Sequence, residues 1–191
     1  MNLRGKRALA PERTISLNVT SAQQHNKNRR DFSPMTESNF RGYYNFEAYW
    51  QSGKVFEGIS EAVTKKFWKN ITEPKRRYPG SKGKRVLYAQ WIDNSVKEMD
   101  YITSRKKVYV PLYYEMMKDT EMALYWKKRV DEGENIVIYD FDGPRLSDGD
   151  VTCIQVNEKI LQQKINDTRF PFGHGYVVAA FLAGIEISKF I

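Results

Sequence analysis

Cysteine and histidine are scarce in this chain. Its 191 residues include one cysteine, Cys153, and two histidines, His25 and His174. A single cysteine excludes an intramolecular disulfide and a cysteine-rich zinc site, and two histidines are too few for a histidine-rich metal centre. The sequence therefore predicts a protein of a reducing compartment that holds neither a metal nor another cofactor.

Long apolar runs are also missing. The longest run, around residues 177–187, is far shorter than the roughly 20 residues that a membrane-spanning helix needs. The first residues, MNLRGKRALAPERT, contain no apolar stretch like that of a secretory signal peptide. We therefore expect a cytoplasmic protein without a membrane partner.

Acidic residues are too few to balance the basic ones. The chain has 31 Lys and Arg against 23 Asp and Glu, a formal net charge of +8, and 14% of its residues are aromatic. A positive surplus favours phosphate-bearing partners such as nucleotides, ADP-ribose or nucleic acid, and aromatic rings can stack on flat ligands. Charge alone does not choose among these partners.

The length and the residue pattern predict a mainly helical α+β domain with a small β-sheet. Residues 1–30 are expected to form a basic N-terminal arm, mobile apart from a short strand at 14–20, and residues 31–191 to form the globular domain. A second strand is predicted at 135–141. Periodicity and capping residues predict helices that follow Asn45 through Phe56 and that cover residues 61–70, 97–118, 120–132, 156–164 and 176–187.

The segment 75–85, KRRYPGSKGKR, concentrates basic charge in a loop. It has six basic residues, no acid, and turn signals at Pro79–Gly80 and Gly83. Backbone N–H groups and cations in such a loop can wrap a diphosphate. The alternative is an exposed charged loop without a ligand, since the GxxxxGK[ST] spacing of a P-loop is absent.

Two carboxylates follow the strongest predicted strand. Asp140 and Asp142, in YDFDGPR, stand where a strand end presents polar groups, and a carboxylate there can act as a general base or stabilise an oxocarbenium-like centre. Asp-Gly-Pro is also ordinary turn chemistry, which is the alternative.

Two further candidates lie near predicted helix starts. Glu47 shares a helix face with Gln51 and Lys54. Burial among the aromatic residues of this helix would raise the pKa of its carboxyl group and suit it to acid–base catalysis. The alternative is an exposed glutamate in the first turn of a helix. His174, in Gly-His-Gly, precedes the last helix, where free N–H groups could meet an anion; the alternative is a structural hydrogen bond.

Read in order, four segments resemble motifs of the NADAR superfamily, which is named for links to NAD and ADP-ribose metabolism. They are DFSPM at 31–35, YYNFEAYWQSGK at 43–54, YDFDG at 139–143 and GHGYVVAAFL at 173–182. Glu47, Trp50–Gln51 and Lys54 match the family's helix motif residue by residue, whereas Phe141-Asp142-Gly143 stands where the family has Trp-Gly-Asp-Gly. A second set of segments also resembles phage-encoded proteins in its order, which implies a phage origin and the host cytoplasm. These segments are RYP at 77–79, the Gly-Lys-rich loop at 80–84, DFDG at 140–143 and GHG at 173–175.

The resemblance implies an N-glycosidase-like hydrolase that acts on a ribosylated or ADP-ribosylated nucleotide-type substrate. Glu47 and Asp142 would be the catalytic carboxylates, with Asp140 as the alternative to Asp142. The substrate-binding residues expected with this function are Trp50, Tyr139 and Phe141 for the base or ribose, and Lys54, Arg76, Arg77, Lys82 and Arg105 for phosphate. Gln51 and His174 complete the expected set of substrate-binding residues.

Two non-enzymatic functions remain open at this stage. The basic arm and loop, with aromatic stacking, suit a nucleic-acid-binding protein. A phage protein that sequesters a nucleotide signal would use the same residue types. The expected partners are accordingly a phosphate-bearing small molecule, ADP-ribosylated nucleic acid or nucleic acid itself.

Overall fold

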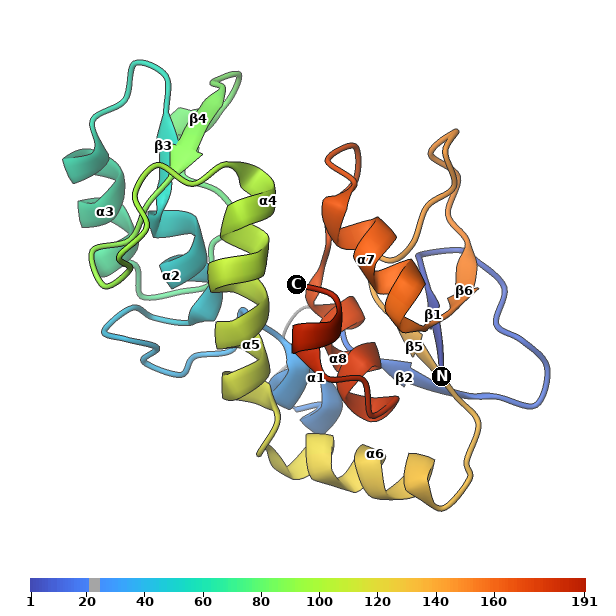
Figure 1. Cartoon of the computed structure of the whole chain (residues 1–191). Coiled ribbons are helices and arrows are strands. Elements are labelled where there is room, and N and C mark those ends of the chain that lie inside the picture. The colour runs from blue at the N-terminus through green and yellow to red at the C-terminus, as the bar shows by residue number, and fades with distance from the viewer. Residues whose placement is uncertain (21–24) are drawn as a thin grey trace. The chain divides into compact units, whose positions relative to one another are not determined.

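The computed structural model describes residues 1–20 and 25–191 (Figure 1). It confirms the predicted α+β class, with many helices and small sheets. The chain divides into two compact units, one formed by residues 1–33 with 110–191 and the other by residues 34–109. No helix in the described ranges is both long and apolar enough to span a membrane.

A four-stranded mixed sheet organises the first unit. Its order is β2 (Ile15–Asn18), β5 (Ile136–Tyr139), β1 (Asn2–Arg4) and β6 (Cys153–Gln155). The strand β5 runs parallel to both of its neighbours, and β6 is antiparallel to β1. Ile136, Val137 and Ile138 are all buried, as an apolar run in a central parallel strand should be. Both strands predicted from the sequence, at 14–20 and 135–141, are confirmed.

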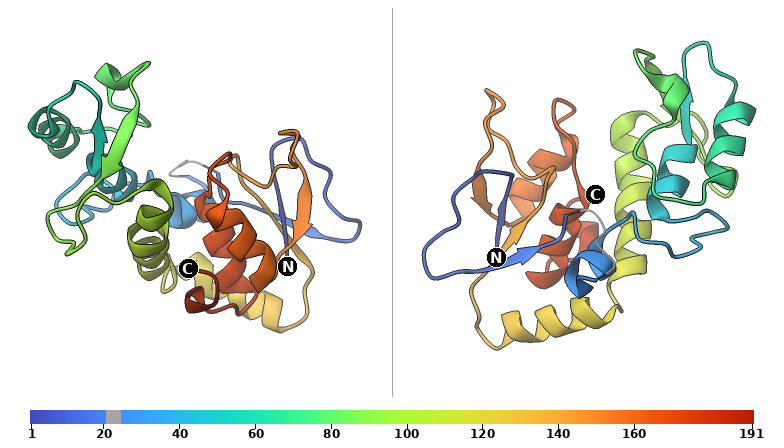
Figure 2. Two further views of the ribbon diagram at one scale, coloured as in Figure 1. Left: turned by 45° about the horizontal axis from the view of Figure 1, so that its top comes forward. Right: turned by 180° about the vertical axis from the view of Figure 1, so that it is seen from behind.

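The prediction of a mobile basic arm over residues 1–30 is wrong for the first residues of the chain and for residues 27–30, which begin the helix Lys27–Phe32. Asn2–Arg4 form β1 inside the sheet, next to β5 (Figures 1 and 2), and Leu3 is completely buried. Three residues with one apolar side chain give no readable alternation, so only the distant partner strands define this strand. Residues 21–24 of the predicted arm lie outside the described residues.

The remaining elements of the first unit are helical. The apolar α8 is buried on most sides, as predicted, because Tyr176 through Ala180 and Leu182 are all inaccessible. Side-chain caps start α6 at Thr120 and α7 at Asn157, where Asn157 Oδ1 accepts the Ile160 N–H at 2.9 Å. The helices are α1 (Lys27–Phe32), α5 (Val110–Met117), α6 (Glu121–Asp131), α7 (Glu158–Asn166), α8 (His174–Leu182) and the 3₁₀ turn η3 (Ile187–Lys189).

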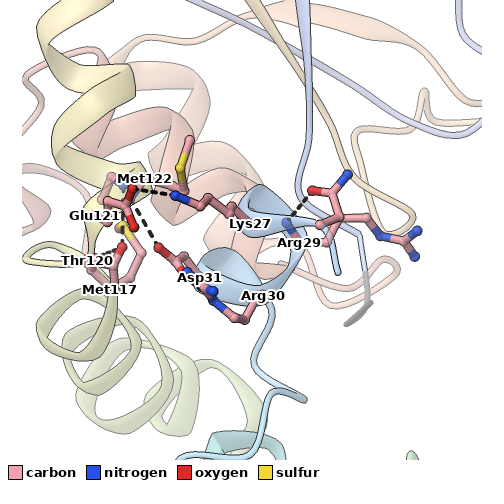
Figure 3. A network of polar contacts seen from close by, with 10 residues as sticks. Lys27, Arg29, Arg30, Asp31, Met117, Thr120, Glu121 and Met122 are labelled. Carbon is pink, nitrogen blue, oxygen red and sulfur yellow. Dashed lines mark hydrogen bonds and ion pairs between the residues drawn. The ribbon is translucent and has the colours of Figure 1, made fainter. Parts of the chain in front are cut away.

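A polar network joins α1 to α6 (Figure 3). Asp31 Oδ2 accepts the Met122 N–H at 3.2 Å in the first turn of α6, and its Oδ1 accepts from Arg30 Nε at 2.8 Å. Lys27 Nζ pairs with Glu121 Oε1 at 2.8 Å. Asp31 opens the DFSPM segment, so this motif residue has a structural role at a helix junction.

The second unit combines helices with a two-stranded sheet. Asn45 caps α2, since its Oδ1 accepts the Ala48 N–H at 2.8 Å, and α3 has the predicted bounds. The elements are α2 (Phe46–Ser52), β3 (Lys54–Phe56), α3 (Glu61–Asn70), the 3₁₀ turn η1 (Pro79–Ser81), β4 (Val86–Ala89), α4 (Tyr101–Ser104) and the π-helical segment η2 (Arg105–Tyr109).

The helix that begins after Asn45 is shorter than predicted. It ends at Ser52, and Lys54–Phe56 pair antiparallel with β4 instead of continuing it. A Cβ atom on Gly53 would lie 2.1 Å from Cε2 of Trp91, so the backbone here packs directly on an indole ring. The sequence pattern assigned Phe56 to the helix because a buried phenylalanine fits the spacing of a helix as well as that of a strand.

The predicted helix at 97–118 is interrupted. It begins at the Asp100 cap, where the Thr103 N–H donates to Asp100 Oδ1 at 2.6 Å, and it changes to π-helical geometry over Arg105–Tyr109 before α5. Pro111 lacks an N–H and its ring crowds the preceding turn, which the wider π turn accommodates. Pro111 in the sequence indicates a helix start or kink, and the structure has the change of geometry just before it.

Candidate functional site

The residues predicted to form a site belong to both units, so we describe them within each. The second unit contains Glu47, Trp50, Gln51, Lys54, Arg76, Arg77, Lys82 and Arg105. The first unit contains Tyr139, Asp140, Phe141, Asp142 and His174.

A charged cluster forms where α2 meets β3 in the second unit. Glu47, half-buried in the first turn of α2, accepts a hydrogen bond on Oε1 from Gln51 Nε2 at 2.7 Å. Burial lowers the pKa of the half-buried Lys54, Glu47 opposes this shift, and Arg77 from the basic loop adds to it. Four predicted residues are thus linked in series: Gln51 to Glu47, Glu47 to Lys54, and Lys54 to Arg77.

The cluster has the groups needed for acid–base work. The amide of Gln51 fixes the orientation of the Glu47 carboxylate, while Lys54 and Arg77 supply cations suited to phosphate oxygens. In the ranges described, no three His, Cys, Asp or Glu side chains are grouped to hold a metal ion. The groups that the cluster itself contains are a carboxylate, an amide and two basic side chains.

Trp50 and Arg105 are packed in the interior of the protein. Trp50 stacks on Trp91 with ring centroids 5.2 Å apart, and its other close ring is Tyr109 at 5.0 Å. Arg105 is 1% exposed, and its guanidinium carbon lies 3.8 Å from the centroid of the Tyr101 ring. Both side chains contribute to the core, and a ligand would reach them only after local rearrangement.

The basic loop, residues 75–85, contains a hydrogen-bonded turn at its centre, and most of its basic side chains are exposed. The Ser81 N–H donates to the Tyr78 carbonyl at 3.0 Å, and Gly83 adopts the left-handed conformation with φ +74°. A Cβ on Gly80 would lie 2.7 Å from the Tyr78 ring, so glycine allows the turn to close on that ring. The exposed cations of the loop are Arg76, Arg77, Lys82, Lys84 and Arg85.

Asp140 has a clear structural role. Its buried carboxylate accepts the Gly175 N–H on Oδ2 at 2.9 Å and so caps the N-terminus of α8. A Cβ on Gly175 would lie 2.6 Å from the Asp140 Cβ, and one on Gly173 would lie 2.9 Å from Oδ2. The glycines of the Gly-His-Gly motif are therefore needed for the helix to approach this carboxylate.

His174 is held between two acceptors. Its Nε2 lies 2.6 Å from the Val19 carbonyl oxygen, which requires Nε2 to carry a proton and donate. Its Nδ1 lies 3.7 Å from Asp140 Oδ2, and its ring is 5.8 Å from that of the buried Tyr113. These contacts match the alternative interpretation of His174 as a structural hydrogen-bonding residue.

Replacing Asp140 with alanine is expected to destabilise the protein by about 2 kcal/mol, because the buried Gly175 N–H loses a charged acceptor. Asp140→Asn should recover part of this loss, since the amide oxygen still accepts. Urea unfolding measures both, with Asp119→Ala as the exposed control. Unchanged stability in Asp140→Ala would contradict the capping role.

Phe141 and Asp142 lie beyond the strand end, both exposed. Gly143, next in the chain, packs on the backbone of the first strand, since a Cβ there would lie 2.6 Å from the Arg4 carbonyl oxygen. Tyr139 is half-buried, with the Arg4 guanidinium carbon 4.7 Å from its ring centroid. Asp142 is therefore the accessible carboxylate of this motif, and Asp140 is the buried one.

A cavity of about 220 Å³ in the second unit was not foreseen from the sequence. Arg41 forms an ion pair with Asp93, and Asp93 Oδ1 also accepts a hydrogen bond from the Tyr49 hydroxyl at 2.8 Å. Lys65, which also lines the cavity, forms an ion pair at 2.8 Å with Glu61, which does not line it. Burial and Asp93 raise the pKa of Tyr49, which keeps its hydroxyl a donor. Within this cavity, Arg41, Asp93 and Tyr49 thus satisfy one another.

The pKa of Lys54 predicts a pH dependence of stability. Its folded-state pKa lies below the ordinary 10.5, so the charged form is disfavoured in the fold, and the unfolded chain binds more protons between the two values. Stability should rise with pH across that window. Lys54→Met should therefore be more stable than the wild type at neutral pH, with a difference that shrinks toward pH 10.5; Lys159→Met, at an exposed site, is the control.

Comparison of the chain with family models, curated proteins and solved structures finds no match. The NADAR resemblance therefore rests on the sequence motifs alone.

Proposed function

We propose that this protein is an N-glycosidase-like hydrolase of the NADAR type that acts on a ribosylated or ADP-ribosylated nucleotide-type substrate. The observation that carries the proposal is the Glu47 cluster: a carboxylate oriented by Gln51 at 2.7 Å, with Lys54 and Arg77 close enough to influence one another electrostatically.

The chemistry of the proposed reaction suits these groups. Breaking an N-glycosidic bond develops positive charge at the ribose C1′, which a carboxylate stabilises. Glu47 would accept a proton from water as the water oxygen attacks C1′, and the C–N electron pair would leave with the base. An anionic base would then take this proton from Glu47, whereas nicotinamide leaves as a neutral molecule. Lys54 and Arg77 would bind phosphate oxygens of the same substrate.

Asp142 is the proposed second carboxylate. Its carboxylate is exposed, whereas that of Asp140 is buried and accepts the Gly175 N–H as a helix cap. Of the two, Asp142 is thus the better candidate for a catalytic role. Its contribution is assessed by Asp142→Asn in the same turnover assay.

The direct test is a search for product. The purified chain is incubated with NAD, with nucleosides and with ADP-ribosylated DNA, and chromatography measures release of free base or ADP-ribose. Catalytic release that exceeds one equivalent per protein supports the proposal. Absence of release from every substrate of this class would rule it out.

The exposed basic loop favours one alternative, a nucleic-acid-binding protein that performs no chemistry. Arg77, Lys82 and Arg85 all lie on the surface, as phosphate-contacting side chains must. In that case a labelled oligonucleotide binds with an affinity that falls steeply with salt, and no nucleotide is turned over. Stoichiometric capture of a nucleotide without product would instead identify a sequestering protein.

A further inference from the structure

A second pocket, of about 260 Å³, lies in the first unit beside the end of β5. Its lining includes Lys6, Arg7 and Arg145 together with the ring of Phe141. We propose that this pocket binds a nucleobase that carries a phosphate group, either as a free nucleotide or within a single strand. The proposal does not depend on the Glu47 cluster or on any hydrolase activity.

Parallel pairing of β1 with β5 builds the pocket. Arg4 pairs with Tyr139 at the end of both strands, so the segments that follow leave the sheet at the same edge. After β1, the Ala8 N–H donates to the Gly5 carbonyl at 3.2 Å and closes a turn with Lys6 and Arg7 at its centre. After β5, the backbone of Gly143 packs on that of Gly5, where no side chain fits.

Phe141 provides an open aromatic surface. Its side chain is 46% exposed, although a phenylalanine has no polar group that would favour contact with water. Lys6 Nζ lies 5.2 Å from the ring centroid. An exposed ring beside a cation is the arrangement with which single-strand-binding proteins stack a base and hold its phosphate.

The cations of the pocket are available to a ligand. Across residues 1–20 and 25–191, neither Lys6 nor Arg7 nor Arg145 takes part in an ion pair. Asp150 is the acid of the lining. This differs from the cavity around Arg41, where Arg41 and Asp93 form an ion pair, and leaves a net positive pocket for a phosphate.

Two features fix the positions of these cations. Arg145 donates from Nη1 to the Gly149 carbonyl at 2.9 Å, across the hairpin that lines one side of the pocket. Arg7 has φ +71°, a conformation that costs energy for a residue with a side chain and that clusters at functional sites. The turn therefore defines the backbone from which the Arg7 side chain leaves at the pocket.

Fluorescence anisotropy and calorimetry on the full chain test the proposal with three probes: AMP, inorganic phosphate and a ten-nucleotide oligothymidylate. The variants are Phe141→Ala, Phe141→Leu and the double variant Lys6→Gln/Arg7→Gln. The control Lys128→Gln/Lys159→Gln removes two exposed charges from α6 and α7. Thermal melting confirms that each variant is folded.

AMP or the oligonucleotide should bind more tightly than phosphate alone. Both Phe141 variants should weaken that binding about 5-fold or more, the usual contribution of one stacked base. The Lys6/Arg7 variant should weaken it similarly and, for the oligonucleotide, reduce the slope of log Kd against log salt by about 1.4. Binding of AMP alone identifies a free nucleotide, and tighter binding of the oligonucleotide identifies a strand.

Three outcomes would overturn the proposal. They are phosphate binding as tight as that of AMP, unchanged affinity in both Phe141 variants, and equal weakening by the Lys128/Lys159 control. Turnover by the Glu47 cluster is measured separately, so either proposal can fail while the other stands.

Discussion

Replacing Glu47 with glutamine is expected to reduce release of free base at least about 100-fold, the usual contribution of a positioned acid–base group. The fold should be intact, because glutamine has the same shape and its amide oxygen can still accept from Gln51 Nε2, now 2.7 Å from the Glu47 carboxylate. Substrate affinity should change much less, since Lys54 and Arg77 remain. Single-turnover kinetics, a substrate titration and thermal melting measure the three quantities.

The matched control for this variant is Glu57→Gln. Glu57 lies in the same unit and is exposed, with a long contact of 3.8 Å to Arg85. It should retain full turnover. Full activity in Glu47→Gln, or an equal loss in Glu57→Gln, would remove Glu47 from the mechanism.

Gly53→Ala is expected to destabilise the protein by about 3 kcal/mol, at the upper end of the usual cost of overpacking. The new methyl would lie 2.1, 2.4 and 2.6 Å from three atoms of the Trp91 indole. That indole is 5% exposed, stacks on Trp50 and donates from Nε1 to the Tyr49 carbonyl at 2.9 Å, so it cannot move away cheaply. Urea unfolding followed by tryptophan fluorescence measures the loss.

A double-mutant cycle identifies the cause of this loss. Gly53 has φ −78°, which alanine adopts freely, so backbone strain does not explain a penalty. In a Trp91→Leu background the same alanine should cost less than about 1 kcal/mol, because the obstructing ring is gone. An equal penalty in both backgrounds would show that the indole is not responsible.

Features that depend on neighbouring residues were predictable from the sequence. The caps at Asn45, Thr120 and Asn157 lie within three residues of the N–H groups that they satisfy. The buried strand β5 is an apolar run whose pattern needs no partner to be recognised. The pairing of Glu47 with Gln51 likewise follows from their spacing of four.

Features that depend on residues far apart in the chain were not predictable from the sequence. Lys54 was placed on a helix because its strand partner, Ala89, lies far along the chain, and the same is true of Asn2–Arg4 and β5. The sequence presented Asp142 as the expected catalytic carboxylate and Asp140 as its alternative, and it did not show that their environments differ. The approach of Gly175 to within hydrogen-bonding distance distinguishes them, since it makes Asp140 a cap and leaves Asp142 exposed.

By itself the sequence determined the α+β class, the surplus of positive charge, and the local starts of most helices, because capping, periodicity and composition act over a few residues. Only the tertiary structure decided which strands pair and that the Trp91 indole occupies the place of a side chain on Gly53. It also decided that Lys6 and Arg7 line the same pocket as Phe141. Strand pairing and close packing join residues far apart in the chain, and no local pattern encodes the identity of a distant partner.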